Sequence, residues 1–395
     1  MTNKFIKDPI FKEIDLNRDP IIGELISCKE FQRLQNIMQL GICYKLFPTA
    51  MHSRYIHSLG AYEVASRFLD VIGGKCSKKH KRLVQVAALL HDLGHGPLSH
   101  VFERFGGSHE QWTLDIIVSK KSSINKVLKK YNVDIDELIL IYQNKYPIKW
   151  LNQIISSDLD VDRIDYLLRD SYFIGTHYGT IDLDIILRRF EIIDDTLVFS
   201  IKNFNMIESF LLGRIYMNID IYENKNLMVY EWTLELIFKR LAELKNEWPI
   251  YEKNISISKK YDWIYKKKEV SLDLYLELDD SSLITFINEV ANVTNDELLI
   301  FIIEGFKTCK NFSYAKPEDF AKKHKITNKE VHKDYIYSEK TIKHKAIFSK
   351  EADKHIVFYD SENKLIEFKK TKLFDNLEKQ VNISKIVLLN NNFID

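Results

Sequence analysis

Cysteine is scarce in this 395-residue sequence, and its spacing indicates neither disulfides nor zinc fingers. The four cysteines are Cys28, Cys43, Cys76 and Cys309, and no two of them form a CxxC pair. Zinc-finger frameworks need such pairs, and small disulfide-bonded domains need more cysteines for their length. The sequence therefore favours a reducing compartment, and we expect a cytoplasmic protein.

Long apolar runs and a strong net charge are also absent. No run of 18 apolar residues occurs, so we expect no transmembrane helix and no membrane partner. Residues 1–8 are polar and lack the apolar core of a signal peptide. Lysine and arginine number 57 against 56 aspartate and glutamate residues. The resulting formal charge of +1 gives no overall positive field that would attract nucleic acid.

Glycine and proline are few as well, at thirteen and seven residues, which is typical of a mostly helical chain. Residues 1–25 are expected to be extended or irregular, with Asp8-Pro9 and Asp19-Pro20 as turn signals. Residues 197–201 alternate like a hairpin strand. Elsewhere apolar residues recur with helical spacing. The predicted helical segments are 31–41, 57–72, 81–94, 109–119, 122–131, 150–170 and 205–247.

The last third of the chain has a different character. Residues 344–369 and 384–388 alternate well enough to be strands. Lys322–Lys350 holds nine lysines and three histidines against three acidic residues, which fits a solvated lysine face or a local patch for phosphate or nucleic acid. We predict a mainly α-helical bundle over residues 1–240. A smaller helical and mixed α/β region would follow over 241–395, with a regulatory or oligomerisation role.

The most informative segment is AALLHDLGHGPLSH, at residues 87–100. An apolar run ends in the adjacent pair His91 and Asp92, and His95 and His100 follow. Imidazole and carboxylate are the ligands of divalent metals that prefer nitrogen and oxygen. Histidine is also the side chain best suited to proton transfer near neutral pH. The segment therefore indicates an enzyme, with half of a metal site and with acid/base candidates.

Further metal-ligand candidates lie on both sides of this segment. His57 stands at the start of a predicted helix, and Asp162 lies in the acidic stretch SDLDVDRIDY at 157–166. Taken singly, His57 is more often a capping or core histidine, and an acidic stretch is more often a solvated face. Packed helices can nevertheless bring distant ligands into one site. Two imidazoles and two carboxylates suit Mn, Fe, Zn or Mg and leave positions open for water or phosphate.

The order His57, then His91-Asp92, then Asp162 matches the H…HD…D signature of the HD-domain phosphohydrolase superfamily. Over about residues 5–230 the chain resembles its deoxynucleoside triphosphate triphosphohydrolase branch. The matching segments are FQRL at 31–34, QLG at 39–41, FP at 47–48, HSLG at 57–60, HDLGHGPLSH at 91–100 and DVDRIDY at 160–166. The resemblance implies that His57, His91, Asp92 and Asp162 bind the metal. It also implies that a dNTP is cleaved to deoxynucleoside and triphosphate.

Roles in catalysis and substrate binding are also implied by the resemblance. His95 and His109 would be the acid/base and phosphate-contacting residues, and His100 and Glu103 would complete this catalytic group. The implied phosphate contacts are Arg54, Arg163, Arg214 and Lys225. The implied sugar contacts are Gln39, Leu40, Tyr166, Asp170 and Tyr222. Among these, Gln39 and Asp170 would hold the 3′-hydroxyl, while Leu40 and Tyr222 would reject ribose by crowding the 2′ carbon.

Assembly and regulation follow from the same comparison. Members of this branch form dimers of dimers, so the resemblance implies a homo-oligomer, as a dimer or a tetramer. The candidate allosteric residues are Lys4, Gln32 and Arg33. Ser27 and Gln35 stand where an activating site of this branch reads guanine with an aspartate and an arginine. We therefore expect no activation by GTP through the same contacts.

Two other functions remain open from the residues. The chain could be an HD phosphohydrolase for a nucleoside monophosphate, a cyclic nucleotide, a ribonucleotide or a nucleic-acid end. Cyclic dinucleotides are disfavoured because no HHExxDGxGYP-like segment occurs. It could also be a non-catalytic nucleotide- or nucleic-acid-binding module that uses Lys322–Lys350. A binding module has no need of four metal ligands and a histidine pair, which favours the enzyme.

Overall fold

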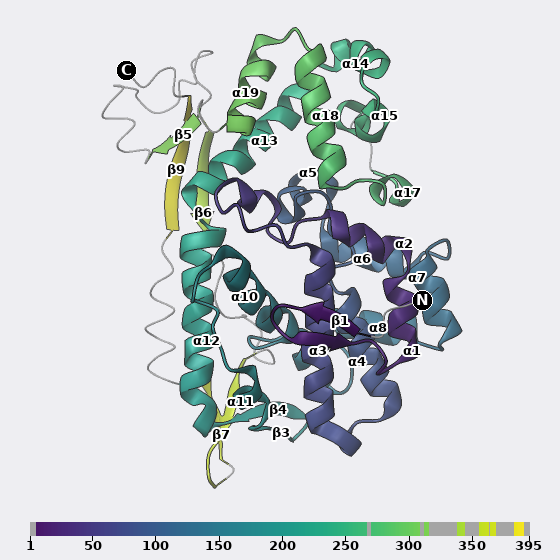
Figure 1. The fold of residues 1–395 in the computed structure, drawn as a ribbon, viewed down its shortest axis with the longest axis vertical. Coiled ribbons are helices and arrows are strands. Elements are labelled where there is room, and N and C mark those ends of the chain that lie inside the picture. The colour runs from purple at the N-terminus through teal and green to yellow at the C-terminus, as the bar shows by residue number, and fades with distance from the viewer. Residues whose placement is uncertain are drawn as a thin grey trace. The chain divides into compact units, whose positions relative to one another are not determined.

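A computed structural model describes residues 5–266, 270–308, 312–315, 338–343, 355–362, 364–368 and 383–390. This part of the chain is mainly helical with small sheets, which confirms the predicted fold class (Figure 1). Packing divides the chain into two compact units, Met1–Met217 with Ala346–Lys379 and Asn218–Lys345 with Gln380–Asp395. The division falls after Met217, whereas the sequence places it at residue 240, and that domain boundary stays a prediction.

The first unit is a helical bundle with a hairpin and a small sheet. Its α-helices are α1 Pro20–Ile26, α2 Lys29–Gln32, α3 Arg54–Ile72, α4 Lys78–Leu90, α5 Glu103–Gly106, α6 His109–Val118, α7 Ser123–Lys130, α8 Ile135–Tyr142, α9 Lys149–Ile155, α10 Val161–Ile174, α11 Leu183–Leu187 and α12 Phe204–Met217. Its 3-10 turns are η1 Arg33–Asn36, η2 Gly41–Lys45, η3 Gly73–Lys75, η4 Ser99–Val101 and η5 Ile201–Asn203. Its strands are β1 Phe5–Asp8, β2 Lys12–Asp15, β3 Phe190–Ile193, β4 Thr196–Ser200, β7 Val357–Tyr359 and β8 Leu365–Glu367.

Helix α3 is the centre of this unit and packs against both α4 and α10 (Figure 1). It is buried on nearly every side, with Leu59, Val64 and Ala65 fully enclosed. A helix that is buried on several faces has neighbours on each of them. The helices that meet around α3 therefore bring residues far apart in the sequence into one core.

Two small sheets accompany the first unit. Strands β1 and β2 form an antiparallel hairpin. Strands β3 and β4 pair antiparallel, with Phe190 opposite Phe199, and β7 and β8 extend that sheet in the order β3-β4-β7-β8. The strand predicted at 197–201 is thereby confirmed. Strands β7 and β8 lie within the predicted stretch 344–369.

The second unit is built around helices α13, α18 and α19 and a three-stranded antiparallel sheet in the order β5-β9-β6. Its described core is aromatic, with Tyr261 stacked on Phe286 at 4.3 Å between ring centroids. Its elements are η6, a π-helix, Asn218–Tyr222, α13 Lys225–Glu243, η7 Lys245–Glu247, α14 Trp248–Asn254, α15 Ser258–Tyr261, α16 Trp263–Lys266, α17 Leu272–Tyr275, α18 Asp280–Val293, α19 Glu297–Thr308, β5 Phe312–Ala315, β6 Ser338–Lys343 and β9 Ile383–Asn390. Strand β9 contains the predicted strand 384–388.

Three segments differ from their predicted structure. Asp19 and Pro20 do not form a turn: Asp19 caps α1 through its side chain, and Pro20 occupies the first helical position, where its missing N–H is no cost. The predicted helix at 31–41 is only α2 followed by η1, and Ile37 is extended. The pattern over 150–170 is two helices, because the Asp160 side chain accepts the Arg163 N–H and starts α10 afresh.

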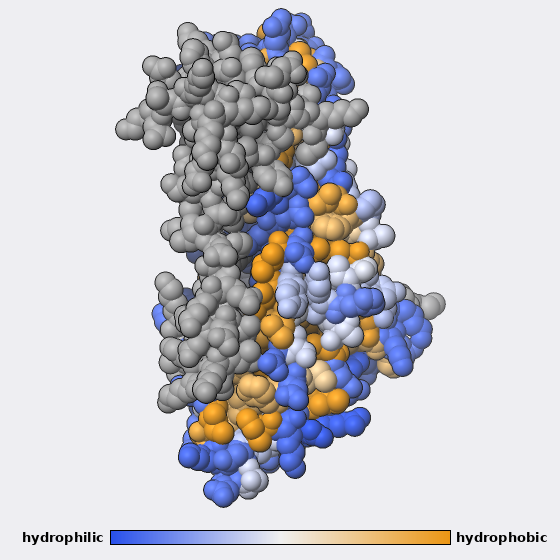
Figure 2. Space-filling model, turned by 90° about the vertical axis from the view of Figure 1, so that its left-hand side faces the viewer, coloured by the Kyte–Doolittle hydropathy of each residue, from blue (hydrophilic) through white to orange (hydrophobic). Residues whose placement is uncertain are grey.

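No described helix combines the length and the apolar character that a bilayer crossing requires. On the face drawn in Figure 2, hydrophobic residues lie in several groups among hydrophilic ones. The basic segment Lys322–Lys350 lies outside the described residues except for the backbone of β6, so its predicted role as a patch stays a prediction.

Candidate metal centre and active site

Three helices bring the four predicted metal ligands together, and we call His57, His91, Asp92 and Asp162 the candidate metal centre. His57 lies in the first turn of α3, His91 caps the C-terminus of α4, and Asp162 is the second residue of α10. The Nε2 atom of His57 lies 3.2 Å from His91 Nε2, 3.1 Å from Asp162 Oδ1 and 3.5 Å from Asp92 Oδ2. His91 Nε2 lies 3.5 Å from the same Asp162 oxygen.

These distances fit a divalent cation. Ligand atoms about 2.1 Å from one ion and at right angles to each other are about 3 Å apart. Ligating atoms of His57, His91 and Asp92 form a compact group that could hold a metal ion, and Asp162 closes it from α10. Two imidazoles and two carboxylates are a donor set for first-row metals and magnesium. The protein is therefore metal-dependent in its chemistry, as predicted.

The Nδ1 atom of each imidazole already has a hydrogen-bond partner, and this partner favours one tautomer of the ring. His57 Nδ1 lies 2.8 Å from Asp165 Oδ2, and His91 Nδ1 lies 2.8 Å from the carbonyl oxygen of Ala88. A proton on each Nδ1 would leave the two Nε2 atoms available to a bound cation. Burial alone would lower the pKa of His57, but hydrogen bonds to Asp162 and Asp165 raise it to about 10. The carboxylates of Asp92, Asp162 and Asp165 around His57 thus favour a positive charge at this site.

Both ligand carboxylates are held in their ionised form. Burial raises the pKa of Asp92, but the charges of His91 and Arg54 bring it well below its ordinary value. Burial likewise opposes ionisation of Asp162, and hydrogen bonds to His57 and His91 bring its pKa well below the ordinary value. Charged carboxylates are the form that binds a metal ion.

Arg54 connects this centre to its surroundings. Its Nη1 is paired with Asp92, its Nε donates to Ser99 Oγ at 3.1 Å, and its Nη2 donates to the Gln39 carbonyl oxygen at 3.0 Å. The side chain is 4% exposed. In this structure the guanidinium orients Asp92. A phosphate at the predicted contact would therefore share the Arg54 nitrogens with Asp92, Ser99 and Gln39.

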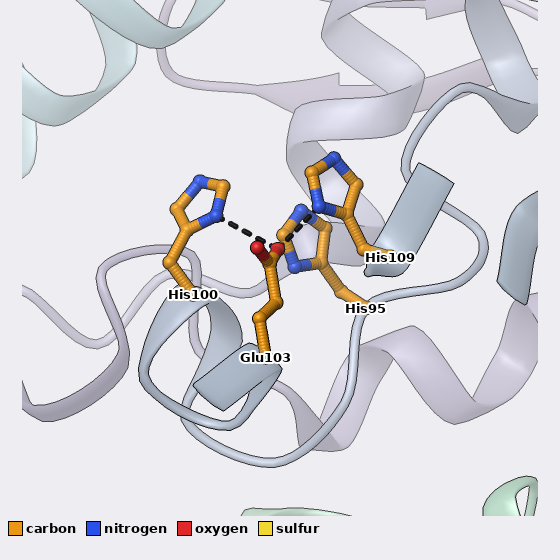
Figure 3. A group of neighbouring side chains, drawn as sticks. All are labelled: His95, His100, Glu103 and His109. Atoms are coloured by element: carbon orange, nitrogen blue, oxygen red, sulfur yellow. Dashed lines mark hydrogen bonds and ion pairs between the residues drawn. The ribbon is translucent and has the colours of Figure 1, made fainter. Parts of the chain in front are cut away.

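The predicted catalytic residues form a second group beside the first, which we call the histidine–glutamate cluster: His95, His100, Glu103 and His109 (Figure 3). His100 Nδ1 lies 3.0 Å from Glu103 Oε1, and His109 Nδ1 is paired with the same oxygen. The His95 ring is stacked on that of His109, with 4.0 Å between centroids and 11° between planes. Burial opposes ionisation of Glu103, but hydrogen bonds to His100 and His109 lower its pKa, so the carboxylate is charged.

His95 is the link between the two groups. Its Nε2 lies 3.4 Å from Asp92 Oδ1, and the residue is completely buried. Neither ring nitrogen has a hydrogen-bond partner among the described residues. Burial and then the charge of Arg54 bring the pKa of His95 well below its usual range. His95 is therefore a buried imidazole next to a carboxylate of the candidate metal centre, a position from which it could exchange a proton.

Gly94 and Arg33 determine the path of the loop between α4 and η4. A Cβ atom on Gly94 would lie 2.1 Å from the His109 carbonyl oxygen, so only glycine lets the loop approach α6 this closely. Arg33, which is 8% exposed, donates from Nη2 to the carbonyl oxygens of Leu93 at 3.2 Å and His95 at 2.7 Å. Arg33 therefore braces this loop from the inside; its predicted allosteric role stays a prediction.

The predicted phosphate contacts lie in different surroundings. Arg214, in the last turn of α12, is 8% exposed, and its Nε and Nη1 have no hydrogen-bond partner among the described residues. A buried guanidinium with free donors suits a phosphate. Arg163 has its Nη1 paired with Asp160 and with the Ser157 carbonyl oxygen, so this nitrogen is already occupied.

The predicted sugar contacts of the first unit lie on three elements. Gln39 is 6% exposed and its Oε1 has no hydrogen-bond partner among the described residues, while the adjacent Leu40 is half-buried. Tyr166 is half-buried on α10, and burial raises its pKa. Asp170 is buried and its Oδ1 lies 2.7 Å from His52 Nε2.

The remaining predictions stay predictions. Tyr222 and Lys225 belong to the second unit, and their predicted contacts with the substrate stay predictions. Gln32 is half-buried and donates from Nε2 to the Ile26 carbonyl oxygen at 2.7 Å. Lys4 lies outside the described residues.

Sequence reasoning missed three residues that support the site. Asp165 holds His57, Arg169 holds Asp165 through two hydrogen bonds of 2.9 and 2.8 Å, and His52 holds Asp170. The i to i+4 spacing of Asp165 and Arg169 on a predicted helix could have indicated their pair. No sequence signal connects His52 with Asp170, which is 118 residues away.

Comparisons with known proteins agree with this geometry. The HD domain family model matches residues 54–170. An uncharacterized protein of Mycoplasma genitalium is 34% identical over 339 residues, which cover 79% of each chain. Human deoxynucleoside triphosphate triphosphohydrolase SAMHD1 is 32% identical over 213 residues, which cover 44% of this chain and 34% of SAMHD1. The crystal structure of a phosphohydrolase from Bacteroides thetaiotaomicron has a TM-score of 0.79 at 25% identity and covers 98% of this chain and 99% of its own.

Proposed function

The chain belongs to the HD-domain family of metal-dependent phosphohydrolases, and from that premise we propose that it hydrolyses dNTPs to deoxynucleoside and triphosphate. The observation that carries the proposal is the buried His95 beside the four converging residues of the candidate metal centre, with its Nε2 3.4 Å from Asp92 Oδ1. The similarity to SAMHD1 supports the nucleotide class, over the part of the chain that the two share.

Charge is the main obstacle in this reaction. A nucleoside triphosphate carries about four negative charges, which must be neutralised before water can attack a phosphoryl group. A bound divalent ion would polarise the phosphoryl oxygen and lower the pKa of a water molecule. Arg214 would add a buried cation with free donors, which supports a triphosphate over a neutral substrate.

Proton transfer falls to the histidine–glutamate cluster. His95 would be the base, because its Nε2 lies beside Asp92 of the candidate metal centre and its Nδ1 has no hydrogen-bond partner among the described residues. His109 Nδ1 and His100 Nδ1 both lie against the same Glu103 oxygen, so the carboxylate orients both rings. The same residues would deliver a proton to the leaving deoxynucleoside oxygen.

Sugar selection would use buried polar atoms. Gln39 Oε1 lacks a partner and Asp170 is fixed by His52, so both can accept a hydrogen bond from a 3′-hydroxyl. A substrate without that hydroxyl would leave Gln39 Oε1 unpaired, at a cost of about 1–3 kcal/mol. Leu40 would oppose a 2′-hydroxyl by its bulk.

A product assay tests the proposal. The protein is loaded separately with Mn²⁺, Mg²⁺, Fe²⁺ or Zn²⁺ and incubated with each dNTP and each NTP, and the products are separated by chromatography. Deoxynucleoside with intact triphosphate is the expected result. Cleavage of only other phosphoesters would replace the proposal with a different HD phosphohydrolase. No turnover with any metal, together with tight binding of DNA or RNA, would indicate a binding module.

We also propose a homo-oligomer, a dimer or a tetramer, in the cytoplasm. The motifs that the chain shares with the deoxynucleoside triphosphate triphosphohydrolase branch imply the assembly, and light scattering on the purified protein tests it. A monomer at micromolar concentration, with and without dNTP, would contradict it.

Binding of nucleic acid through Lys322–Lys350 is tested by fluorescence polarisation with labelled DNA and RNA over a range of salt concentrations.

A further inference from the structure

A buried chain of charged groups runs from the candidate metal centre to the N-terminal hairpin. His57 Nδ1 lies 2.8 Å from Asp165 Oδ2, and Arg169 donates to both Asp165 oxygens at 2.9 and 2.8 Å. Arg169 Nη1 then donates to Asp8 Oδ2 at 2.7 Å. The first three residues are completely buried and Asp8 is 7% exposed. Each charge in the chain therefore depends on its neighbour, because water cannot replace it.

Asp8 has two roles in this arrangement. Its Oδ1 accepts the backbone N–H groups of Ile10 and Phe11, both at 2.9 Å, and so closes the turn between β1 and β2. Its Oδ2 binds Arg169. The Arg169 guanidinium also lies 5.9 Å from the centre of the Phe11 ring. One carboxylate thus shapes the hairpin and docks it on α10.

Asp165 and Arg169, the middle residues of this buried chain of charged groups, are tightly packed against α3. A Cβ atom on Gly60 would lie 1.8 Å from Asp165 Oδ1 and 2.4 Å from Arg169 Nη2. Gly60 lies three residues after His57 on the same helix. Since α3 and α10 touch at this point, Asp165 cannot move away from His57 without also moving Arg169.

We propose that Arg169 and Asp8 are positioning residues of the candidate metal centre, and that the N-terminal hairpin thereby sets the affinity of this centre for its cation. Arg169 orients Asp165, and Asp165 orients the His57 ring so that its Nε2 would face a bound cation. Residues behind a metal-binding histidine commonly change metal affinity about 10- to 100-fold when they are mutated. The inference rests on the proposed ligand set, but it does not depend on the substrate.

The variant Asp8→Asn tests this proposal. Asparagine keeps an oxygen that can close the hairpin turn, but it removes the charge that faces Arg169. We expect Mn²⁺ binding, measured by calorimetry in the absence of nucleotide, to weaken about 10- to 100-fold. The d–d absorption spectrum of the Co²⁺-loaded protein should also change, because the His57 ring is less well held.

Glu63→Gln is the matched control. Glu63 is 2% exposed on the same helix α3, and it accepts hydrogen bonds from Arg18 Nη1 and Arg67 Nε, each at 2.9 Å. Arg67 also lies over the Phe11 ring, at 5.1 Å. This variant removes a comparable buried charge without touching His57. We expect it to lower the thermal midpoint of the metal-free protein as Asp8→Asn does, while its Mn²⁺ affinity stays at the wild-type value.

Arg169→Lys is the second test, because lysine keeps the charge but cannot bind Asp165 through two parallel hydrogen bonds. It should weaken Mn²⁺ binding while the circular dichroism spectrum stays helical. Wild-type affinity in both Asp8→Asn and Arg169→Lys would overturn the proposal, and so would equal weakening in Glu63→Gln. Absence of Mn²⁺ and Co²⁺ binding in the wild type would overturn it together with the ligand set. A failed dNTP assay with these affinities as expected would reject only the substrate.

Discussion

The candidate metal centre and the histidine–glutamate cluster lie side by side, but they hold their side chains in different ways. In the metal centre both imidazoles are fixed from behind, by Asp165 and by the Ala88 carbonyl oxygen. In the cluster His95 has no hydrogen-bond partner among the described residues. A ligand group must keep one geometry, whereas a group that takes up and releases protons must change its partners.

Exposure differs between the two groups as well. The His57 side chain is 0% exposed and that of Asp92 is 7% exposed, while His100 is 55% exposed. Glu103 and His109 lie between these limits, at 29% and 17%. The cluster therefore runs from a buried base to a histidine in contact with solvent. We infer that one group is built to bind an ion and the other to exchange protons, and each of the following variants tests that contrast.

The largest effect is expected from Asp162→Ala, which removes a charged ligand from the metal centre. Metal binding should be lost and dNTP hydrolysis should fall by at least about 10³-fold. The helical fold should survive because the Asp162 side chain is 37% exposed. Metal content after gel filtration, turnover and circular dichroism measure the three outcomes. Asp184→Ala, at a carboxylate that is 65% exposed on α11, is the control and should change none of them. Near-wild-type turnover in Asp162→Ala would show that the ligand assignment is wrong.

The second largest effect is expected from a substitution in the histidine–glutamate cluster alone. His95→Gln should lower kcat about 10²- to 10⁴-fold, because the proposed general base is lost. Bound Mn²⁺ should remain at the wild-type stoichiometry, since His95 is not among the ligands. His80→Gln, at a half-buried histidine of α4, serves as the control for loss of an imidazole. If His95→Gln loses Mn²⁺ together with activity, the division into a binding group and a proton-transfer group fails.

The same contrast explains which parts of the site the sequence could predict. The stretch 87–100 places ligands and proton carriers within one turn and one loop, so residue types and spacing were enough. The stretch 157–166 was harder, because its acidic residues have different tasks: Asp160 caps α10, Asp162 faces His57, and Asp165 holds His57 from behind. Residue type alone describes all of them as one solvated acidic stretch.

Long-range partners could not be predicted at all. Asp8 and Arg169 are 161 residues apart, and their pairing depends on how the hairpin docks on α10. The dipeptide Asp19-Pro20 can begin a turn or the first turn of a helix. In this protein it begins α1, because the apolar residues that follow are buried in the core. Tertiary packing supplied that information.

The smallest expected effect is on the pH dependence of stability. The pKa of His95 in the folded protein lies well below its ordinary value, because of burial and the charge of Arg54. Below about pH 6.5 the unfolded chain therefore takes up a proton that the folded protein refuses, and the free energy of unfolding falls as the pH falls. Each pH unit below that point costs up to about 1.4 kcal/mol for this one group, until the folded pKa is reached.

His95→Gln should remove this component. In urea unfolding of the chelator-treated protein, the wild type should lose more stability than the variant between pH 6.5 and pH 5. Between pH 7 and pH 8 the difference between the two proteins should stay constant, because the imidazole is neutral in both states. A wild type whose stability relative to the variant rises as the pH falls would mean that the folded protein charges His95 readily. The ring would then be partnered like His57, and the contrast between the two groups would not hold.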